Sequence, residues 1–206
     1  MEEILENFNL TDRQHEQFNQ LYDLYVDWNS KINVISRKDI DNLYRNHVLH
    51  SLSLAMFMEL APESEILDLG CGGGFPGIPL AILYPDVTFK LIDARNKKII
   101  VVNEVIEAIG LKNAKGYHQR VEDEKSKFDF IITRAVAKID QLWLWSAPLI
   151  KKKHINIFPN GLLALKGGDI DKECKTLPKK AYWDAEPITQ WYQDDYFEDK
   201  YIVYVQ

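Results

Sequence analysis

Glycines crowd one short stretch of the chain, residues 66–82, which reads ILDLGCGGGFPGIPLAI. An apolar run containing an acid leads into the glycines, and an apolar helical pattern follows them. Glycine adopts positive φ freely, and without a Cβ the backbone can approach a ligand closely. A strand, a glycine-rich turn and a helix in this order are typical of a site for an adenosine-bearing cofactor.

The spacing of the glycines indicates which kind of cofactor. The pattern GxGxxG occurs at Gly72, Gly74 and Gly77, but the apolar run has already ended near Gly70. Counted from Gly70, the spacing is GxGxG. Phe75 then occupies the place where a dinucleotide fold needs a glycine for close packing beneath a pyrophosphate. We therefore expect a ligand without a pyrophosphate.

Two acids accompany this loop. Asp93 follows Gly70 by 23 residues, at the end of the next apolar run, where a carboxylate can accept hydrogen bonds from both ribose hydroxyls of an adenosine. Asp68 lies inside the first apolar run, and two interpretations stay open for it: a bond to a helix terminus, or contact with a cationic group of the cofactor. Cys71 and Cys174 form no disulfide framework or metal-binding pattern, and the sequence contains no nucleophile–base constellation.

Strands and helices must position these side chains. Residues 11–58 have helical spacing, with a capping box at Thr11 and Gln14 and a second helix over 39–58. After them strands and helices alternate, which indicates a parallel sheet with helices on both faces. The strands are expected at 65–70, 87–93, 114–118, 128–134 and 161–167, and the helices at 78–83, 96–109 and 139–149.

The last two aromatic and β-branched runs, residues 179–192 and 199–206, leave no room for a crossover helix, so we expect them to pair antiparallel. A parallel sheet that ends in such a hairpin resembles the α/β, Rossmann-like class I methyltransferase fold, with seven strands in the order 3-2-1-4-5-7-6. We expect an N-terminal helical extension, residues 1–60, packed on one compact methyltransferase domain, residues 61–206.

Composition sets further bounds. The 206-residue chain has a net charge of −6, which argues against a nucleic-acid partner. Its charges are segregated, however: residues 151–180 contain eight lysines and three acids, so a local basic face is possible. Because neither a signal-like start nor a membrane-length apolar run is present, we expect a cytoplasmic protein.

The segment DLGCGGGFPGIPLAI closely resembles the DxGxGxGxPGIPLxI segment of the glucose-inhibited division protein B family, whose members are bacterial small-subunit ribosomal RNA guanine-N7 methyltransferases. Segments matching the same family in the same order are WNSKINVIS (28–36), HVLHS (47–51), QRVED (119–123), ITRAVA (132–137) and LLALKG (162–167). The chain departs from the family's RHxLDS segment at two positions: Asn46 replaces its Arg, and His50 replaces its Asp.

The resemblance implies methylation of a guanine N7 in 16S ribosomal RNA, with S-adenosylmethionine as cofactor. It implies cofactor contacts at Gly70, Phe75, Val121, Glu122 and Arg134, to which the loop and strand patterns add Gly72, Gly74 and Asp93. Arg120, Arg134, Lys166 and Lys200 match basic positions around the family's site, and the first three are expected to position the substrate. The expected partner is the small-subunit RNA or subunit, the expected state is a monomer, and no metal is expected. His47 and His50 have helical spacing but lack a third ligand.

Other classes of function stay open at this point. A methyltransferase of this fold could act on a small molecule or a protein, which the acidic net charge favours. An NAD-dependent oxidoreductase would explain the glycines, although Phe75 and the terminal hairpin argue against it. A non-catalytic RNA-binding protein could retain the fold.

Overall fold

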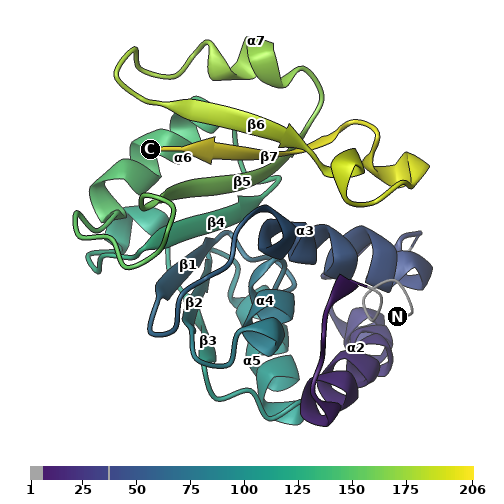
Figure 1. Ribbon diagram of the computed structural model, residues 1–206. Helices are drawn as coiled ribbons and strands as arrows, with labels where there is room; N and C mark the ends of the chain where they lie inside the picture. The colour runs from purple at the N-terminus through teal and green to yellow at the C-terminus, as the bar shows by residue number, and fades with distance from the viewer. Residues whose placement is uncertain (1–6, 37) are drawn as a thin grey trace.

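One mixed sheet organises the molecule, and its strand order is β3-β2-β1-β4-β5-β7-β6 (Figure 1). In the structure, a computed structural model that describes residues 7–36 and 38–206, the sheet has seven strands. β1 to β5 pair parallel, whereas β7 pairs antiparallel with both β5 and β6. The expected strand order and terminal hairpin are therefore confirmed. The strands are β1 (Glu65–Leu69), β2 (Thr88–Asp93), β3 (Ala114–His118), β4 (Phe130–Arg134), β5 (Gly161–Gly167), β6 (Trp183–Pro187) and β7 (Lys200–Val205).

Helices cover both faces of the sheet, as the alternating pattern predicts. α4 (Gly77–Leu83) and α5 (Asn96–Ala108) bury their apolar sides in one core cluster, and α6 (Ile139–Ser146) and α7 (Ile170–Cys174) bury theirs in the other. Neighbouring residues of β1 point to opposite faces: Ile66 belongs to the first cluster and Leu67 to the second, and both are fully buried. Burial of β1 on both faces explains its nearly continuous apolar sequence.

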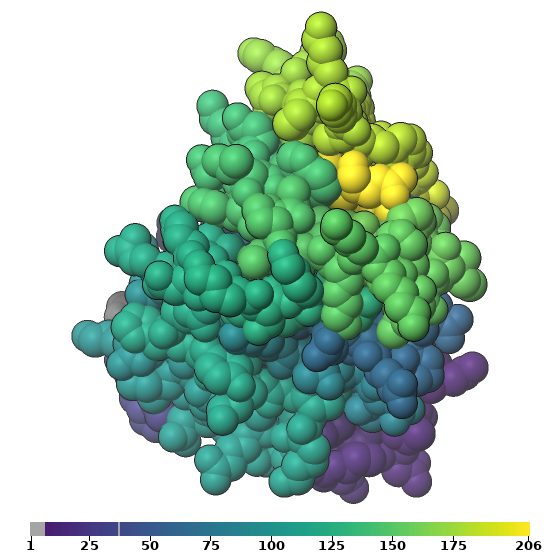
Figure 2. All heavy atoms as spheres, turned by 90° about the vertical axis from the view of Figure 1, so that its left-hand side faces the viewer, coloured from purple at the N-terminus to yellow at the C-terminus, as the bar shows by residue number. Residues whose placement is uncertain are grey.

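The N-terminal helices add to the first of these clusters. α2 (Asp12–Lys31) begins at Thr11, and Thr11 and Gln14 form the capping box that the sequence predicts. The buried side of α2 packs against α4 and α5, and Figure 2 shows α2 at the opposite end of the molecule from the C-terminal strands. The division into an extension, residues 1–60, and a domain, residues 61–206, stays a prediction.

The second helical segment differs from the single helix expected over 39–58. It consists of a 3-10 turn (Ile40–Asn42), a π-helix η2 (Leu43–Leu49) and the α-helix α3 (His50–Phe57). At the end of η2 the His50 N–H donates to the carbonyl of Arg45, five residues back. The Asn46 carbonyl instead accepts from two distant side chains, Arg134 and Tyr196. A π-helix of this kind often marks a functional site.

Two smaller differences have local causes. α6 ends at Ser146, and a 3-10 turn continues to Leu149 because Pro148 has no N–H to donate. The connection between β6 and β7 contains two 3-10 turns, η5 (Ile188–Gln190) and η6 (Asp195–Phe197). This connection lies beside the N-terminal helices, as the yellow segment in Figure 1 shows, and it brings Tyr196 to η2.

Candidate functional site

The glycine loop follows β1 at the carboxyl edge of the sheet. Gly70, Gly72 and Gly74 have φ values of +71°, +58° and +98°, which only glycine adopts readily. Gly77, the last glycine of the alternative GxGxxG frame, instead begins α4. The GxGxG frame counted from the end of the strand therefore describes the turn. A Cβ on Gly74 would lie 2.4 Å from the Ile78 side chain, so Gly74 serves the fold of the loop.

Asp93 ends β2 beside this loop. One carboxylate oxygen accepts the Gly72 N–H at 3.0 Å, and the other accepts the Arg95 N–H at 2.8 Å. An ionised carboxylate offers about four lone-pair positions, so about two remain for a ligand. The side chain is half-buried and lines two cavities.

The two cavities that Asp93 lines adjoin the glycine loop, and Gly70 also lines both of them. The Asp93 cavity has a volume of about 240 Å³, and the glycine-loop cavity has one of about 440 Å³. The Asp93 cavity is lined by Gly70, Asp93, Gln119, Arg120, Val121, Glu122 and Trp145, and the glycine-loop cavity by Gly70, Gly72, Phe75, Asp93, Lys98 and Arg134. The expected cofactor residues thus line one continuous region, except for Gly74.

A third cavity, the Tyr196 cavity, lies next to the glycine-loop cavity and has a volume of about 630 Å³. Arg134 and Ala135 line both. Of the expected basic residues, Arg134, Lys166 and Lys200 line the Tyr196 cavity, whereas Arg120 lines only the Asp93 cavity. The structure therefore brings three of the four together.

Lys166 and Lys200 are not free cations in this arrangement. The Lys166 ammonium pairs with Glu173 at 2.7 Å and donates to the Ala137 carbonyl at 2.9 Å. The Lys200 ammonium donates to the Tyr196 carbonyl and lies 3.7 Å from the centre of the Tyr196 ring. Glu173 thus balances the charge of Lys166 before any substrate binds, whereas the two partners of Lys200 are uncharged.

Phe75 is buried at the base of the loop. Its ring lies 5.0 Å from Tyr25, 5.2 Å from His47 and 5.3 Å from the guanidinium of Arg134, measured to ring centres. The Tyr25 hydroxyl donates to the Gly73 carbonyl at 2.5 Å. Helix α2 thus holds the loop through Tyr25. The sequence missed this role because helical spacing indicates only that Tyr25 is buried.

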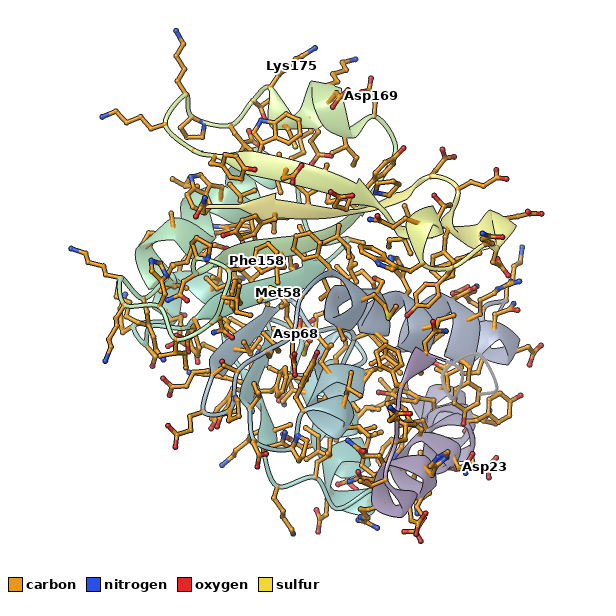
Figure 3. The ribbon with its side chains drawn as sticks, in the orientation of Figure 1. Asp23, Met58, Asp68, Phe158, Asp169 and Lys175 are labelled. Atoms are coloured by element: carbon orange, nitrogen blue, oxygen red, sulfur yellow. The ribbon has the colours of Figure 1, made fainter. Side chains whose placement is uncertain are left out.

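Asp68 bonds to a helix terminus, the first of the two interpretations that the sequence left open, and this terminus is the start of α4. Its Oδ2 accepts the Gly77 N–H at 2.7 Å, and the side chain is fully buried between β1 and α4 (Figure 3). Oδ1 has no hydrogen-bond partner among the described residues. Burial raises the pKa of Asp68 to about 7, although the bond from Gly77 opposes this rise.

We expect Asp68→Asn to change how stability depends on pH. The native pKa of about 7 exceeds the unfolded value of about 3.9, so the native state binds the proton more tightly. Stability should therefore fall as pH rises from about 4 to 7, by roughly 4 kcal/mol relative to Asp68→Asn. Urea unfolding of both proteins across this range measures the difference. A difference that does not change with pH would contradict a buried, proton-binding Asp68.

The two cysteines and His50 are buried among other side chains of the protein. Both cysteines are buried and free, and burial raises the pKa of the Cys71 thiol, which disfavours a thiolate nucleophile. His50 is buried, with its ring edge-on to Tyr196 and Phe197. Within residues 7–36 and 38–206, no group of three or more His, Cys, Asp or Glu side chains is placed to hold a metal. No helix in the same ranges is long and apolar enough to cross a membrane.

The sheet order and the cavities at its carboxyl edge define the class I methyltransferase fold, and solved structures agree. A SAM-dependent methyltransferase from Aquifex aeolicus superposes with a TM-score of 0.57 at 13% identity, covering 80% of this chain and 92% of that one. A ribosomal protein L11 methylase from Lactobacillus delbrueckii subsp. bulgaricus gives a TM-score of 0.56 at 13% identity, covering 76% and 75%. At such identities the likeness concerns the fold alone.

Sequence comparison is more specific. The family described as GidB, rRNA small subunit methyltransferase G, matches residues 14–190. Proteins named ribosomal RNA small subunit methyltransferase G from Phocaeicola vulgatus and Flavobacterium johnsoniae are each 50% identical over 206 residues, covering 100% of this chain and 98% and 97% of theirs. The chain belongs to the rRNA small subunit methyltransferase G family. This confirms the resemblance and the enzyme class expected from the sequence, and it implies a methyl donor of the S-adenosylmethionine type.

Proposed function

We propose that this protein transfers a methyl group from S-adenosylmethionine to N7 of a guanine in the 16S RNA of the small ribosomal subunit. Family membership supports the reaction class. The observation that carries the proposal is the position of Arg134, which lines both the glycine-loop cavity and the Tyr196 cavity. One side chain thereby joins a region suited to the cofactor and a neighbouring basic cavity suited to a nucleotide.

The residues present fit S-adenosylmethionine. A Cβ on Gly72 would have only the Lys98 ammonium at 3.5 Å and the Gly70 carbonyl at 4.0 Å near it, so the backbone there lies open to a ligand. Asp93 retains acceptor capacity for two ribose hydroxyls. In the proposal, Val121 and Glu122 contact the adenine, and Arg134 contacts the amino-acid end. The bound cofactor supplies an electrophilic methyl group on a sulfonium.

Methylation of guanine N7 requires the enzyme to position the base, and it requires no proton transfer. N7 of guanine is a hydrogen-bond acceptor with a free lone pair, so it needs no general base. The enzyme's residues then have to hold the base in line, at near-attack distance, and exclude water. This agrees with a site in which the thiol of Cys71 is buried and protonated.

The target guanine must leave its helix to reach this site. N7 faces the major groove, which is deep and narrow in folded RNA, so the base should come from a loop or be splayed outward. In the proposal, Arg134 and Lys166 contact the O6/N7 edge or adjacent phosphates in the Tyr196 cavity. Arg120, which lines the Asp93 cavity, contacts the cofactor or a more distant phosphate. We propose that the protein acts as a cytoplasmic monomer.

A labelling experiment tests the substrate class. The purified protein is incubated with methyl-labelled S-adenosylmethionine and small ribosomal subunits that lack the modification, and the RNA, protein and small-molecule fractions are counted. We expect label in the RNA fraction. Label confined to ribosomal protein or to a small molecule would contradict the substrate, and cofactor binding without any transfer would favour a non-catalytic RNA-binding protein.

A further inference from the structure

Arg134 is held in place by the π-helix η2 of the N-terminal segment. One guanidinium nitrogen donates to the Asn46 carbonyl at 3.1 Å, and another lies 2.8 Å from Nδ1 of His47. The guanidinium also lies over the Phe75 ring. Of its five N–H donors, the bonds to η2 use two, so three remain for ligands in the two cavities that Arg134 lines.

The bond to His47 determines which ring nitrogen carries the proton. A guanidinium only donates hydrogen bonds, so Nδ1 of His47 must be the acceptor and must be unprotonated. The proton of the neutral ring then lies on Nε2, which is 2.6 Å from Oδ2 of Asp39. Asp39 therefore accepts this proton and selects the tautomer that Arg134 requires.

The electrostatics of the three groups agree with this arrangement. Burial, together with the neighbouring charge of Arg134, lowers the pKa of His47 to about 4, which keeps the ring neutral near pH 7. Burial alone would raise the pKa of Asp39, but hydrogen bonds from Asn46 and His47 hold it below its ordinary value. Asp39 is therefore ionised, and it also accepts a bond from the Asn46 side-chain amide.

We propose that Asp39 and His47 are positioning residues for Arg134: Asp39 fixes the tautomer of His47, and His47 with the Asn46 carbonyl holds the guanidinium between the two cavities. Asp39 lines none of the three cavities, and His47, which also lines the Tyr196 cavity, acts in this proposal through its bond to Arg134. The inference rests on the proposed function, because Arg134 matters for methyl transfer only if both cavities are used. The π-helix contributes to this arrangement. Because the His50 N–H donates to the Arg45 carbonyl, five residues back, the Asn46 carbonyl accepts from Arg134 instead.

A spectrum of the wild-type protein tests the tautomer without any RNA. Nitrogen chemical shifts of labelled histidine distinguish protonated from unprotonated ring nitrogens. At pH 7 we expect His47 with Nε2 protonated and Nδ1 unprotonated, and a partial loss of this preference in Asp39→Ala. Protonated Nδ1 in the wild-type protein would overturn the inference.

A double-mutant cycle tests the positioning. A displacement of about 1 Å can cost about 100-fold in rate, so we expect Asp39→Ala to lower kcat/KM for methylation about 10- to 100-fold. In an Arg134→Ala background the same change should cost almost nothing, because residues that act through one another are not additive. Asp41→Ala, which removes an exposed acid two residues away, is the matched control and should leave the rate within twofold of the wild type.

The outcomes separate this inference from the proposed function. Equal losses from Asp39→Ala with and without Arg134 would show an independent structural role and overturn the positioning. A wild-type protein that labels no RNA would instead contradict the proposed function, and the tautomer spectrum would then decide the inference alone. Melting temperatures of the variants identify any loss of rate that comes from unfolding.

Discussion

The Asp93→Ala variant is expected to bind S-adenosylmethionine roughly 100- to 10,000-fold more weakly than the wild type. In the proposed site the carboxylate accepts two ribose hydroxyls, and a hydrogen bond to a charged group is worth about 1.5–3 kcal/mol. Two such bonds give about 3–6 kcal/mol, and 1.4 kcal/mol corresponds to a tenfold change in affinity. The substitution also removes the acceptors of the Gly72 and Arg95 N–H groups, which loosens the loop.

Titration calorimetry measures this change, with Asp86→Ala as a matched control. Asp86 is exposed and lies just before β2, whereas Asp93 ends the same strand. Both variants replace one aspartate by alanine, so they change the net charge equally. The control should bind the cofactor as the wild type does. Unchanged affinity of Asp93→Ala would remove its ribose role.

The second large effect is expected from Gly77→Ala, which should lower the free energy of unfolding by roughly 3–5 kcal/mol. A Cβ at this position would lie 2.6 Å from Oδ2 of Asp68 and 2.9 Å from the Leu91 side chain, and both neighbours are fully buried. Overpacking of this kind costs about 1–3 kcal/mol. Displacing Asp68 also breaks its bond to the Gly77 N–H and leaves buried polar groups unpaired, which costs about 1–3 kcal/mol.

Gly73→Ala is the control in the same loop. Gly73 has no positive φ, and its Cβ would meet Val34 at 3.4–3.6 Å, an ordinary contact. Urea denaturation should therefore show a change within about 1 kcal/mol for Gly73→Ala. If the two variants were equally stable, close packing of Asp68 against α4 would not be the reason for glycine at position 77.

The features predicted well from the sequence depend on local patterns. The terminal hairpin follows from two β-branched runs too close together for a crossover helix, and the structure pairs β6 with β7 accordingly. The frame of the glycine loop follows from where β1 ends, and positive φ at Gly70, Gly72 and Gly74 agrees with it. Such features need only the residue types and their spacing.

The features that the sequence did not predict depend on partners far along the chain. The π-helix exists where the Asn46 carbonyl meets Arg134 and Tyr196, which are 88 and 150 residues away. Helical spacing contains no sign of either partner. The departure from the family's Arg at Asn46 likewise makes sense only in three dimensions, because its amide bonds to Asp39.

The distribution of charge on the surface was the property that the sequence predicted least well. The lysine-rich segment 151–180 suggested a basic face, yet Lys151 pairs with Glu65 and Asp129, and Lys166 pairs with Glu173. Other lysines of this segment do project into solvent, including Lys175, which directly follows α7 (Figure 3). A count of charges therefore overstates the basic surface that the fold presents.

Mapping the methylated atom tests the central claim most directly. Small-subunit RNA labelled by the purified protein is divided into two parts. One part is digested to nucleosides, and mass spectrometry identifies the labelled nucleoside. The other part is kept intact and treated with borohydride and aniline, which cleave the chain at 7-methylguanosine and so locate its position. The proposed function requires label on 7-methylguanosine at one position. Label on a ribose, on another base or on another atom of guanine would contradict it.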